Sequence, residues 1–284
     1  MMGRFFVWVV GSVGLASAAW LVSAQLGTAQ SLADEHVKLE LVSEQNALVS
    51  KEELFLGIRF TLQDGWHTYW INPGDSGEAP RIEWQLPVGF QAGQVQWPYP
   101  ERLATPPFAD YGYENGVLLL TSVRPPGKLR EGETAKIAAQ VHYLICRDVC
   151  IPGQKQLTLV LPVENHAAAS PESALFAAAR ARIPRPVPRN WKISATSRGD
   201  EFILDLRTGR LIKVVEFFPL QAEQIENAAP QKTTAAPGGV RLHLKKSKRL
   251  LKSIARLEGV IVLDSDKAYL ANVPVRSSKM SRHN

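Results

Sequence analysis

The sequence predicts an all-β protein in which two antiparallel β-sandwich domains follow an N-terminal export signal and are joined by a short helix and a Pro-rich linker. Two observations favour this architecture. Short segments of alternating apolar and polar residues recur along most of the chain, separated by Gly- or Pro-rich turns, and this pattern is typical of antiparallel sandwiches. One Ala-rich stretch followed by several prolines, within residues 164–190, divides these segments into two groups.

Residues 1–29 have the features of a secretory signal peptide. Arg4 precedes an apolar run over residues 5–22, and small residues ending at Ala24 follow it; these are the parts of a cleavable signal. We expect cleavage near residue 24 or near residue 29. The alternative is a retained membrane anchor, because the run approaches the ~18 residues that a span needs. No later stretch is long and apolar enough to cross a bilayer, so we expect a soluble exported protein without a transmembrane segment.

The first domain is expected at residues 34–165. The segments between its strands are rich in Pro and Gly, and these residues favour turns. Its strands are predicted at residues 37–41, 54–60, 116–123, 135–145 and 156–163, and its turns at residues 72–77, 97–100 and 124–127.

The helix and Pro-rich linker are expected at residues 166–190. Ser170 followed by Pro171 is typical of a helix start, with Ser as the N-cap, and the helix is expected to reach Ile183. A second, smaller sandwich is expected at residues 191–276 and a flexible tail at residues 277–284. Strands of this second sandwich are predicted at residues 191–197, 201–207, 214–219, 240–244, 256–264 and 268–275.

Charge is distributed unevenly between the two halves. Residues 34–165 contain 11 Lys/Arg and 17 Asp/Glu, whereas residues 166–284 contain 21 and 10. A basic cluster in the second half is predicted to be a solvated face, with a membrane surface or an acidic partner as the alternative. The cluster consists of Lys245, Lys246, Lys248, Arg249 and Lys252. No nucleic-acid-binding motif is present, so we expect no nucleic-acid partner.

Cys146 and Cys150 are the two cysteines of the chain, and an oxidising compartment favours a disulfide between them. In the chain-entropy model so small a ring stabilises by only ~2 kcal/mol, against ~3 kcal/mol for a fifteen-residue loop. A domain of about 130 residues buries a sizeable core without such a staple. The pair is therefore predicted to exchange disulfides. A structural disulfide and Cu(I) binding by the two thiolates remain open alternatives.

The cysteines would lie at the mouth of a hairpin if residues 138–146 and 155–163 are its arms. The thiolate would be the attacking species in the reduced form, and Arg147 favours it while Asp148 opposes it. On a strand His142 would lie ~13 Å from Cys146, which is too far for the two to share a metal ion.

An aromatic-rich segment, residues 65–70, is predicted to pack in the core, with a shielding surface near the cysteines as the alternative. His67 in this segment is a candidate for proton transfer, although a structural role is the simpler interpretation. No Ser-His-Asp set, phosphate-binding loop or clustered metal-ligand motif is present in the sequence. We therefore expect no cofactor, no resident metal and no hydrolase or nucleotide chemistry.

Four segments, GWHTYWINPGDSG, QWPYPER, DYGYENGVLL and YLICRDVCIP, together resemble the N-terminal periplasmic domain of DsbD-type thiol:disulfide interchange proteins. The resemblance is closer to the branch that includes the copper-sensitivity suppressor ScsB. It is strong over residues 37–165 and less specific in the second half, where VVEFFP is similar to the second β-domain of that branch. It implies immunoglobulin-like sandwiches whose cysteine pair takes electrons from a thioredoxin-like domain and passes them to exported oxidised proteins.

The resemblance also implies roles for individual residues. Cys150 matches the sulfur attacked by the electron donor, and Cys146 matches its resolving partner. In well-known members a Phe just before a Tyr-Gly pair shields the disulfide, whereas here Asp110 precedes Tyr111. The candidates for shielding are therefore Phe108, Tyr111 and Tyr113. The spacing of the cysteines differs from that of the best-known DsbD members and suits the ScsB-like branch.

DsbD-type proteins continue into a multi-helix membrane domain and a thioredoxin-like domain, and the sequence contains neither. The resemblance thus implies a separate, membrane-linked thioredoxin-like donor and exported disulfide-containing proteins as acceptors. The expected function is a periplasmic thiol:disulfide oxidoreductase that relays electrons, associated through its branch with copper tolerance. The alternative is a non-enzymatic two-domain adaptor, or a copper-binding protein, with a structural disulfide.

Overall fold

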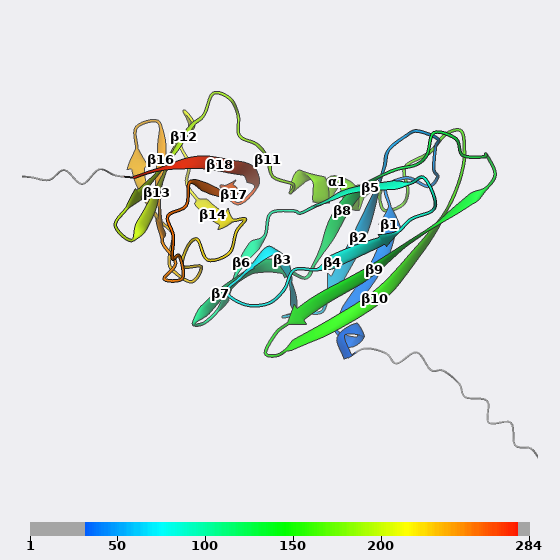
Figure 1. Ribbon diagram of the computed structural model, residues 1–284, viewed down its shortest axis with the longest axis horizontal. Helices are drawn as coiled ribbons and strands as arrows, with labels where there is room; N and C mark the ends of the chain where they lie inside the picture. The colour runs from blue at the N-terminus through cyan, green and yellow to red at the C-terminus, as the bar shows by residue number, and fades with distance from the viewer. Residues whose placement is uncertain (1–31, 278–284) are drawn as a thin grey trace, which may run out of the picture. The chain divides into compact units, whose positions relative to one another are not determined.

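The computed structural model describes residues 32–277, and nearly all of its regular structure is β-strand (Figure 1). The all-β class is confirmed. The predicted signal peptide lies outside the described residues, as does the predicted tail apart from Ser277, which is the last residue of strand β18. Among residues 32–277, no helix has the length and apolar character needed to cross a bilayer.

The first domain consists of two facing sheets formed by strands β1 to β10. A short 3-10 helix, η1 (Leu32–Glu35), precedes them. One sheet has the order β1 (Val37–Ser43), β2 (Leu54–Leu62), β8 (Gly116–Arg124), β5 (Gln91–Gln96). The other has the order β10 (Cys150–Pro162), β9 (Thr134–Cys146), β3 (His67–Gly74), β7 (Phe108–Glu114), β6 (Glu101–Thr105), and β4 (Arg81–Gln85) also pairs with β9.

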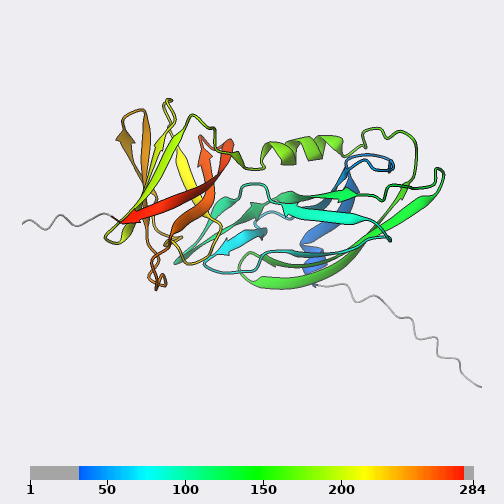
Figure 2. The same cartoon turned by 45° about the horizontal axis from the view of Figure 1, so that its top comes forward.

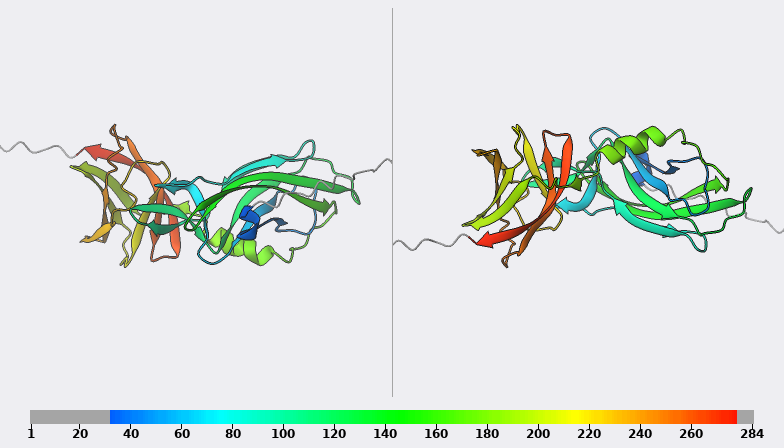
Figure 3. Two further views of the ribbon diagram at one scale, coloured as in Figure 1. Left: turned by 90° about the horizontal axis from the view of Figure 1, so that it is seen from below. Right: turned by 90° about the horizontal axis from the view of Figure 1, so that it is seen from above.

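Strands β9 and β10 form one long hairpin, visible from both sides in Figure 3. Every second residue of β9 from Ala135 to Ile145 is buried, because successive side chains of a strand point to opposite faces. These residues meet Phe60 and other side chains of the opposite sheet in one hydrophobic core. The core therefore determines which face of the hairpin is left for other uses.

Helix α1 (Ser173–Ala181) packs on the first domain (Figure 2). Its Phe176 is fully buried against Leu118 and Leu120 of β8. The helix is shorter than predicted at both ends. Its N-cap is Glu172, not Ser170, because the Ser170 hydroxyl donates to the Ser43 carbonyl oxygen and holds the chain just before the first turn.

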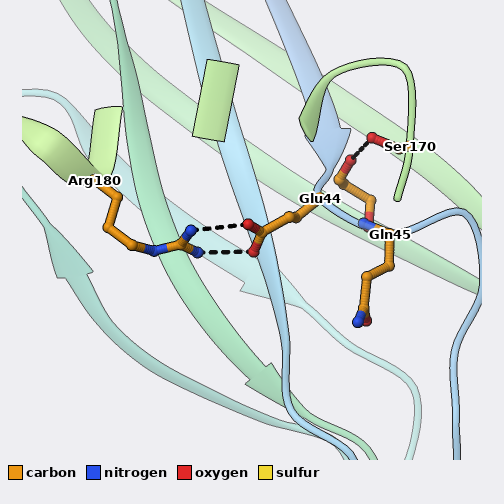
Figure 4. A network of polar contacts seen from close by, with 5 residues as sticks. Glu44, Gln45, Ser170 and Arg180 are labelled. Atoms are coloured by element: carbon orange, nitrogen blue, oxygen red, sulfur yellow. Dashed lines mark hydrogen bonds and ion pairs between the residues drawn. The ribbon is translucent and has the colours of Figure 1, made fainter. Parts of the chain in front are cut away.

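A second contact fixes the other end of the helix. The guanidinium of Arg180 donates two hydrogen bonds to the Glu44 carboxylate, at 2.8 and 2.9 Å (Figure 4). Bidentate pairs of this kind hold their partners in a defined orientation. The segment predicted as a linker is therefore attached to the first domain along its helix.

The second domain consists of strands β11 to β18, which hydrogen-bond to one another in one eight-stranded sheet. Its order is β14 (Val215–Pro219), β17 (Arg256–Leu263), β18 (Lys267–Ser277), β12 (Lys192–Arg198), β13 (Glu201–Arg207), β16 (Gly239–Lys245), β15 (Lys232–Ala236), and β11 (Arg185–Pro186) pairs with β18. Long strand β18 pairs with β17 along most of its length and with β12 at its end. Its own core includes Phe217, Leu204 and Ile261.

The two domains contact each other through the strand that contains the VVEFFP segment. Phe218 packs edge-on against Trp70 and Tyr111 of the first domain, with ring centroids 6.4 and 5.3 Å apart. The Asn72 side-chain amide donates to the Pro219 carbonyl oxygen at 2.7 Å. This contact lies at the end of β3, the strand that also reaches the cysteines.

We expect Phe176→Ala to lower the free energy of unfolding of the first domain by ~3–5 kcal/mol, because the substitution leaves a cavity between the helix and β8. The matched control is Leu175→Ala, whose side chain is partly exposed on the same helix, with an expected change below ~1 kcal/mol. Urea unfolding followed by tryptophan fluorescence measures both. Equal losses in the two variants would contradict the packing described here.

Candidate redox site

The disulfide closes the tip of the β9–β10 hairpin. Cys146 and Cys150 are directly opposite each other in the register, their Cα atoms are 4.1 Å apart, and the S–S distance is 2.03 Å. Only Arg147, Asp148 and Val149 lie between the strands. Cys146 is buried, at 3% exposure, whereas Cys150 is exposed. One sulfur-bearing residue is therefore accessible to another protein and the other is not.

The cysteines lie on the outer face of the sheet, away from the hydrophobic core. Their neighbours along β9 and β10, Ile145 and Ile151, face the core, so alternation places Cys146 and Cys150 on the opposite side. His67 of β3 is the register partner of Cys146, and Tyr69 follows two residues later on the same face. The pairing of β3 with β9 thus brings an imidazole and a phenol beside the disulfide.

The Tyr69 hydroxyl contacts both sulfur atoms. It donates to Cys146 Sγ at 2.8 Å and lies 3.8 Å from Cys150 Sγ. Burial, with a further contribution from the Asp110 carboxylate, raises the pKa of Tyr69 to about 12. The phenol therefore keeps its proton near neutral pH and remains a hydrogen-bond donor to sulfur.

A loop between β3 and β4, which we name the cover loop (residues 75–80), lies over the Tyr69 ring. Gly77 has a φ of +82°, and a Cβ at this position would overlap the ring. Glycine satisfies both requirements, since it alone adopts positive φ without strain and brings the backbone this close. The cover loop therefore limits the movement of Tyr69 away from the sulfur atoms.

Two carboxylates anchor the cover loop. Asp110, buried at 1% exposure, accepts hydrogen bonds from the backbone N–H and the hydroxyl of Ser76. Asp75 accepts one from the Ala109 N–H and one from the side-chain amide of Asn227, in the second domain. Hydrogen bonds to charged groups each contribute ~1.5–3 kcal/mol. The second domain is therefore part of what holds the loop over Tyr69.

His67 is buried beside the disulfide, and its Nε2 has no hydrogen-bond partner among the described residues. Its ring meets the Tyr69 ring edge-on, with centroids 5.3 Å apart. Burial lowers the pKa of His67 below 6.5, against the opposing influence of Asp110 and Glu114. The imidazole is therefore neutral near pH 7 and can accept or donate a proton.

The opposing charges at the hairpin tip interact with each other. Arg147 donates to the Asp148 carboxylate at 3.1 Å, and its guanidinium lies 5.3 Å from the centroid of the Trp66 ring. Trp66 in turn stacks on His36 at 4.2 Å. Because the two charges pair with each other, the stabilising effect of Arg147 on a cysteine thiolate and the destabilising effect of Asp148 partly cancel.

The structure places the three predicted shielding residues on β7. Tyr111 and Tyr113 are buried in the core, and their hydroxyls donate to the Asn227 side chain and to the Pro98 carbonyl oxygen. Phe108 is half exposed at the β6–β7 turn. Shielding by any of the three stays a prediction. The residue in contact with the sulfur atoms is Tyr69. It belongs to the segment 65–70 for which a surface near the cysteines was the alternative prediction, but it was not singled out because the sequence does not reveal that β3 pairs with β9.

Metal ligands do not gather here. Across residues 32–277, no group of three or more His, Cys, Asp or Glu side chains is arranged to hold a metal ion. The two sulfur atoms are engaged with each other in the disulfide. Cu(I) binding would therefore depend on the reduced cysteines alone.

We expect Tyr69→Phe to slow reduction of the disulfide by dithiothreitol about tenfold. When Cys150 is attacked, Cys146 leaves as a thiolate, and the Tyr69 hydroxyl stabilises that charge. A loss of roughly 1.4 kcal/mol of transition-state stabilisation corresponds to tenfold in rate. Stopped-flow fluorescence measures it, with Tyr269→Phe, which packs against the core of the second domain, as the control that leaves the rate unchanged. An unchanged or faster rate in Tyr69→Phe would refute this role.

His67 should make the first domain less stable in mild acid. Because burial lowers its pKa in the folded state, the unfolded chain binds more protons as the pH falls through 6.5, and stability is lost in that window. We expect His67→Gln to lose less stability than the wild type between about pH 7.5 and pH 5.5. Urea unfolding at the two pH values tests this, and the exposed His166 supplies the control, His166→Gln. Identical pH dependence in all three proteins would contradict the prediction.

Comparisons with known proteins identify the family of the first domain and the fold of the chain. Residues 38–162 match the family model of the N-terminal part of the thiol:disulfide interchange protein DsbD. The crystal structure of the N-terminal periplasmic domain of ScsB from Proteus mirabilis is similar, with a TM-score of 0.66 and 15% identity over 88% of this chain and 97% of that chain. No curated protein matches the sequence.

Two other solved structures align over similar lengths. A protein of unknown function from Porphyromonas gingivalis W83 has a TM-score of 0.24 and 12% identity, covering 85% of this chain and 99% of that one. The periplasmic chaperone SfaE has a TM-score of 0.21 and 8% identity, covering 84% and 100%. Both scores are too low to inform the fold. The family match and the ScsB structure agree on one conclusion: residues 38–162 form a DsbD-type N-terminal domain, and its fold is ScsB-like.

Proposed function

We propose that the protein is a periplasmic thiol:disulfide oxidoreductase that relays electrons through Cys146 and Cys150. The observation that carries this proposal is the asymmetry of the disulfide, which has one exposed and one buried cysteine at a hairpin tip. A structural staple has no need of an exposed sulfur, whereas exchange requires that one sulfur be open to attack. The match of residues 38–162 to a thiol:disulfide interchange family supports the same chemistry.

In the first half of the relay, a dithiol donor reduces the protein. A donor thiolate attacks Cys150 Sγ, the Cys146–Cys150 bond breaks, and Cys146 leaves as a thiolate that accepts a hydrogen bond from Tyr69. The second donor thiol then attacks the donor sulfur of the mixed disulfide. This step leaves the donor oxidised and both cysteines reduced, so two electrons and two protons have been transferred.

In the second half, the reduced pair acts on an oxidised exported protein. The Cys150 thiolate attacks the client disulfide, and one client cysteine leaves as a thiol. Cys146 then attacks Cys150 Sγ, which restores the Cys146–Cys150 disulfide and releases the second client thiol. Neutral His67, on the same face as Cys146, is our candidate to accept the Cys146 proton during this step.

The partners we propose follow from this chemistry. The donor is a membrane-linked thioredoxin-like protein, and the acceptors are exported proteins with accessible disulfides. The similarity to a periplasmic domain of ScsB supports a location in the periplasm. A part in copper tolerance belongs to the same proposal, since copper ions oxidise thiols and create disulfides for such a relay to reduce.

We expect Cys146→Ser to accumulate mixed disulfides with client proteins through Cys150, because the thiol that resolves them is missing. Cys150→Ser should accumulate far fewer, since its remaining thiol is buried. Acid quenching, alkylation and non-reducing electrophoresis of periplasmic extracts measure both variants. Equal trapping by the two variants would refute the assignment of Cys150 as the attacking sulfur.

The reduction potential of the pair separates the relay from its alternatives. A value between about −270 and −120 mV supports exchange, whereas a value below about −300 mV describes a structural disulfide. Stoichiometric Cu(I) binding by the reduced protein that is lost in the double Ser variant, without exchange activity, would favour a copper-binding role. Equilibration with glutathione buffers provides the potential.

A further inference from the structure

A groove of about 560 Å³ lies on the outer face of the hairpin, and its lining begins two residues along each strand from the disulfide. We name it the hairpin groove. Its floor is formed by two cross-strand pairs, and its wall by the cover loop and the start of β4. The floor residues are Leu144, Pro152, His142 and Gln154, and the wall residues include Glu78 and Arg81.

The groove continues directly from the cysteines. Leu144 and Pro152 are the next cross-strand pair on the same face as Cys146 and Cys150, and His142 and Gln154 are the pair after that. At ~3.3 Å per residue along a strand, the two pairs lie ~7 and ~13 Å from the disulfide. A chain that presents a sulfur to Cys150 and runs along the hairpin in extended form therefore places every second side chain over one of these pairs.

We propose that the hairpin groove binds an extended segment of the oxidised client protein, on one side of the cysteine that Cys150 attacks. This inference rests on the proposed function and specifies how a client is recognised. The volume is within the range of sites that hold small molecules, ~300–1,000 Å³, so the groove has room for a few side chains of an extended segment. We assign the groove to the client and not to a folded donor, because a groove that follows two successive cross-strand pairs of the hairpin fits an extended, flexible segment.

The chemistry of the floor defines the segment. The client residue two positions from its cysteine lies over Leu144 and Pro152, so an apolar side chain is preferred there. The residue four positions away lies over His142 and Gln154, in a groove that Glu78 and Arg81 also line, so a polar side chain is preferred there. Gln154 is exposed and His142 partly exposed, which leaves hydrogen-bonding capacity for the client main chain.

The test uses a synthetic peptide bound to glutathione through its single cysteine, with Leu two positions and Gln four positions from that cysteine. A second peptide places the same residues on the other side. The reduced protein attacks this disulfide through Cys150, glutathione leaves as a thiol, and Cys146 releases the peptide thiol. We expect Leu144→Lys, which fills the groove, to slow this reaction about tenfold or more with at least one peptide.

The matched control is Val160→Lys, since Val160 is half exposed on the same face at the far end of the hairpin. Its rate should equal that of the wild type. Gln154→Arg, an exposed position in the groove, is a second blocking variant in case Leu144→Lys does not fold. Reduction of each oxidised protein by dithiothreitol should be the same in all variants, because this small thiol needs only Cys150.

The outcomes separate the two proposals. Wild-type peptide rates in both blocking variants would overturn the hairpin groove as a client site, while leaving the relay intact. Slower reaction with thioredoxin, used as a donor probe, but not with the peptides would assign the groove to the donor and overturn the client assignment. Failure of the reduced wild-type protein to react with either peptide would overturn the relay and the groove together.

Discussion

The register of the β9–β10 hairpin is the constraint on which the site depends. Side chains alternate along a strand, so a shift of one residue would turn Cys146 into the core and an isoleucine outward. The buried residues of β9 prevent this shift because they fill the core against the opposite sheet. The same packing that stabilises the first domain therefore holds both sulfur atoms on the outer face of the sheet, away from the core.

The two cysteines of the disulfide have different surroundings, because Cys146 is buried and Cys150 is exposed. Tyr69 donates a hydrogen bond to the sulfur atom of buried Cys146, and His67 lies opposite Cys146 in the register. In the relay that we propose, Tyr69 would stabilise the Cys146 thiolate and His67 would accept the proton of the Cys146 thiol. The exposed end has the hairpin tip and the hairpin groove beside it. Exposure, more than local charge, distinguishes the two cysteines, since Arg147 and Asp148 pair with each other.

The second domain contributes to the site without contributing a redox group. Asn227 bridges Asp75 of the cover loop and Tyr111 of the core, and Phe218 packs against the aromatic side chains behind β3. These contacts brace the strand and the loop that position Tyr69. Without them, the position of Tyr69 beside the disulfide would depend on a loop with few apolar contacts, and such loops open easily.

The sequence by itself determined the all-β class, most strands of the second domain and the pairing of Cys146 with Cys150 in a disulfide. Those conclusions follow from the alternation of apolar and polar residues, from the turn residues and from two thiols close together in the sequence. All of these features involve residues that are near each other along the chain. The sequence did not predict β3 to β7 as strands, or that Tyr69 touches sulfur, although His67 was singled out. Only the tertiary structure decided these points, because a partner strand 77 residues away in sequence supplies the contact between Tyr69 and Cys146. Long-range pairing of this kind leaves no periodic trace in either segment.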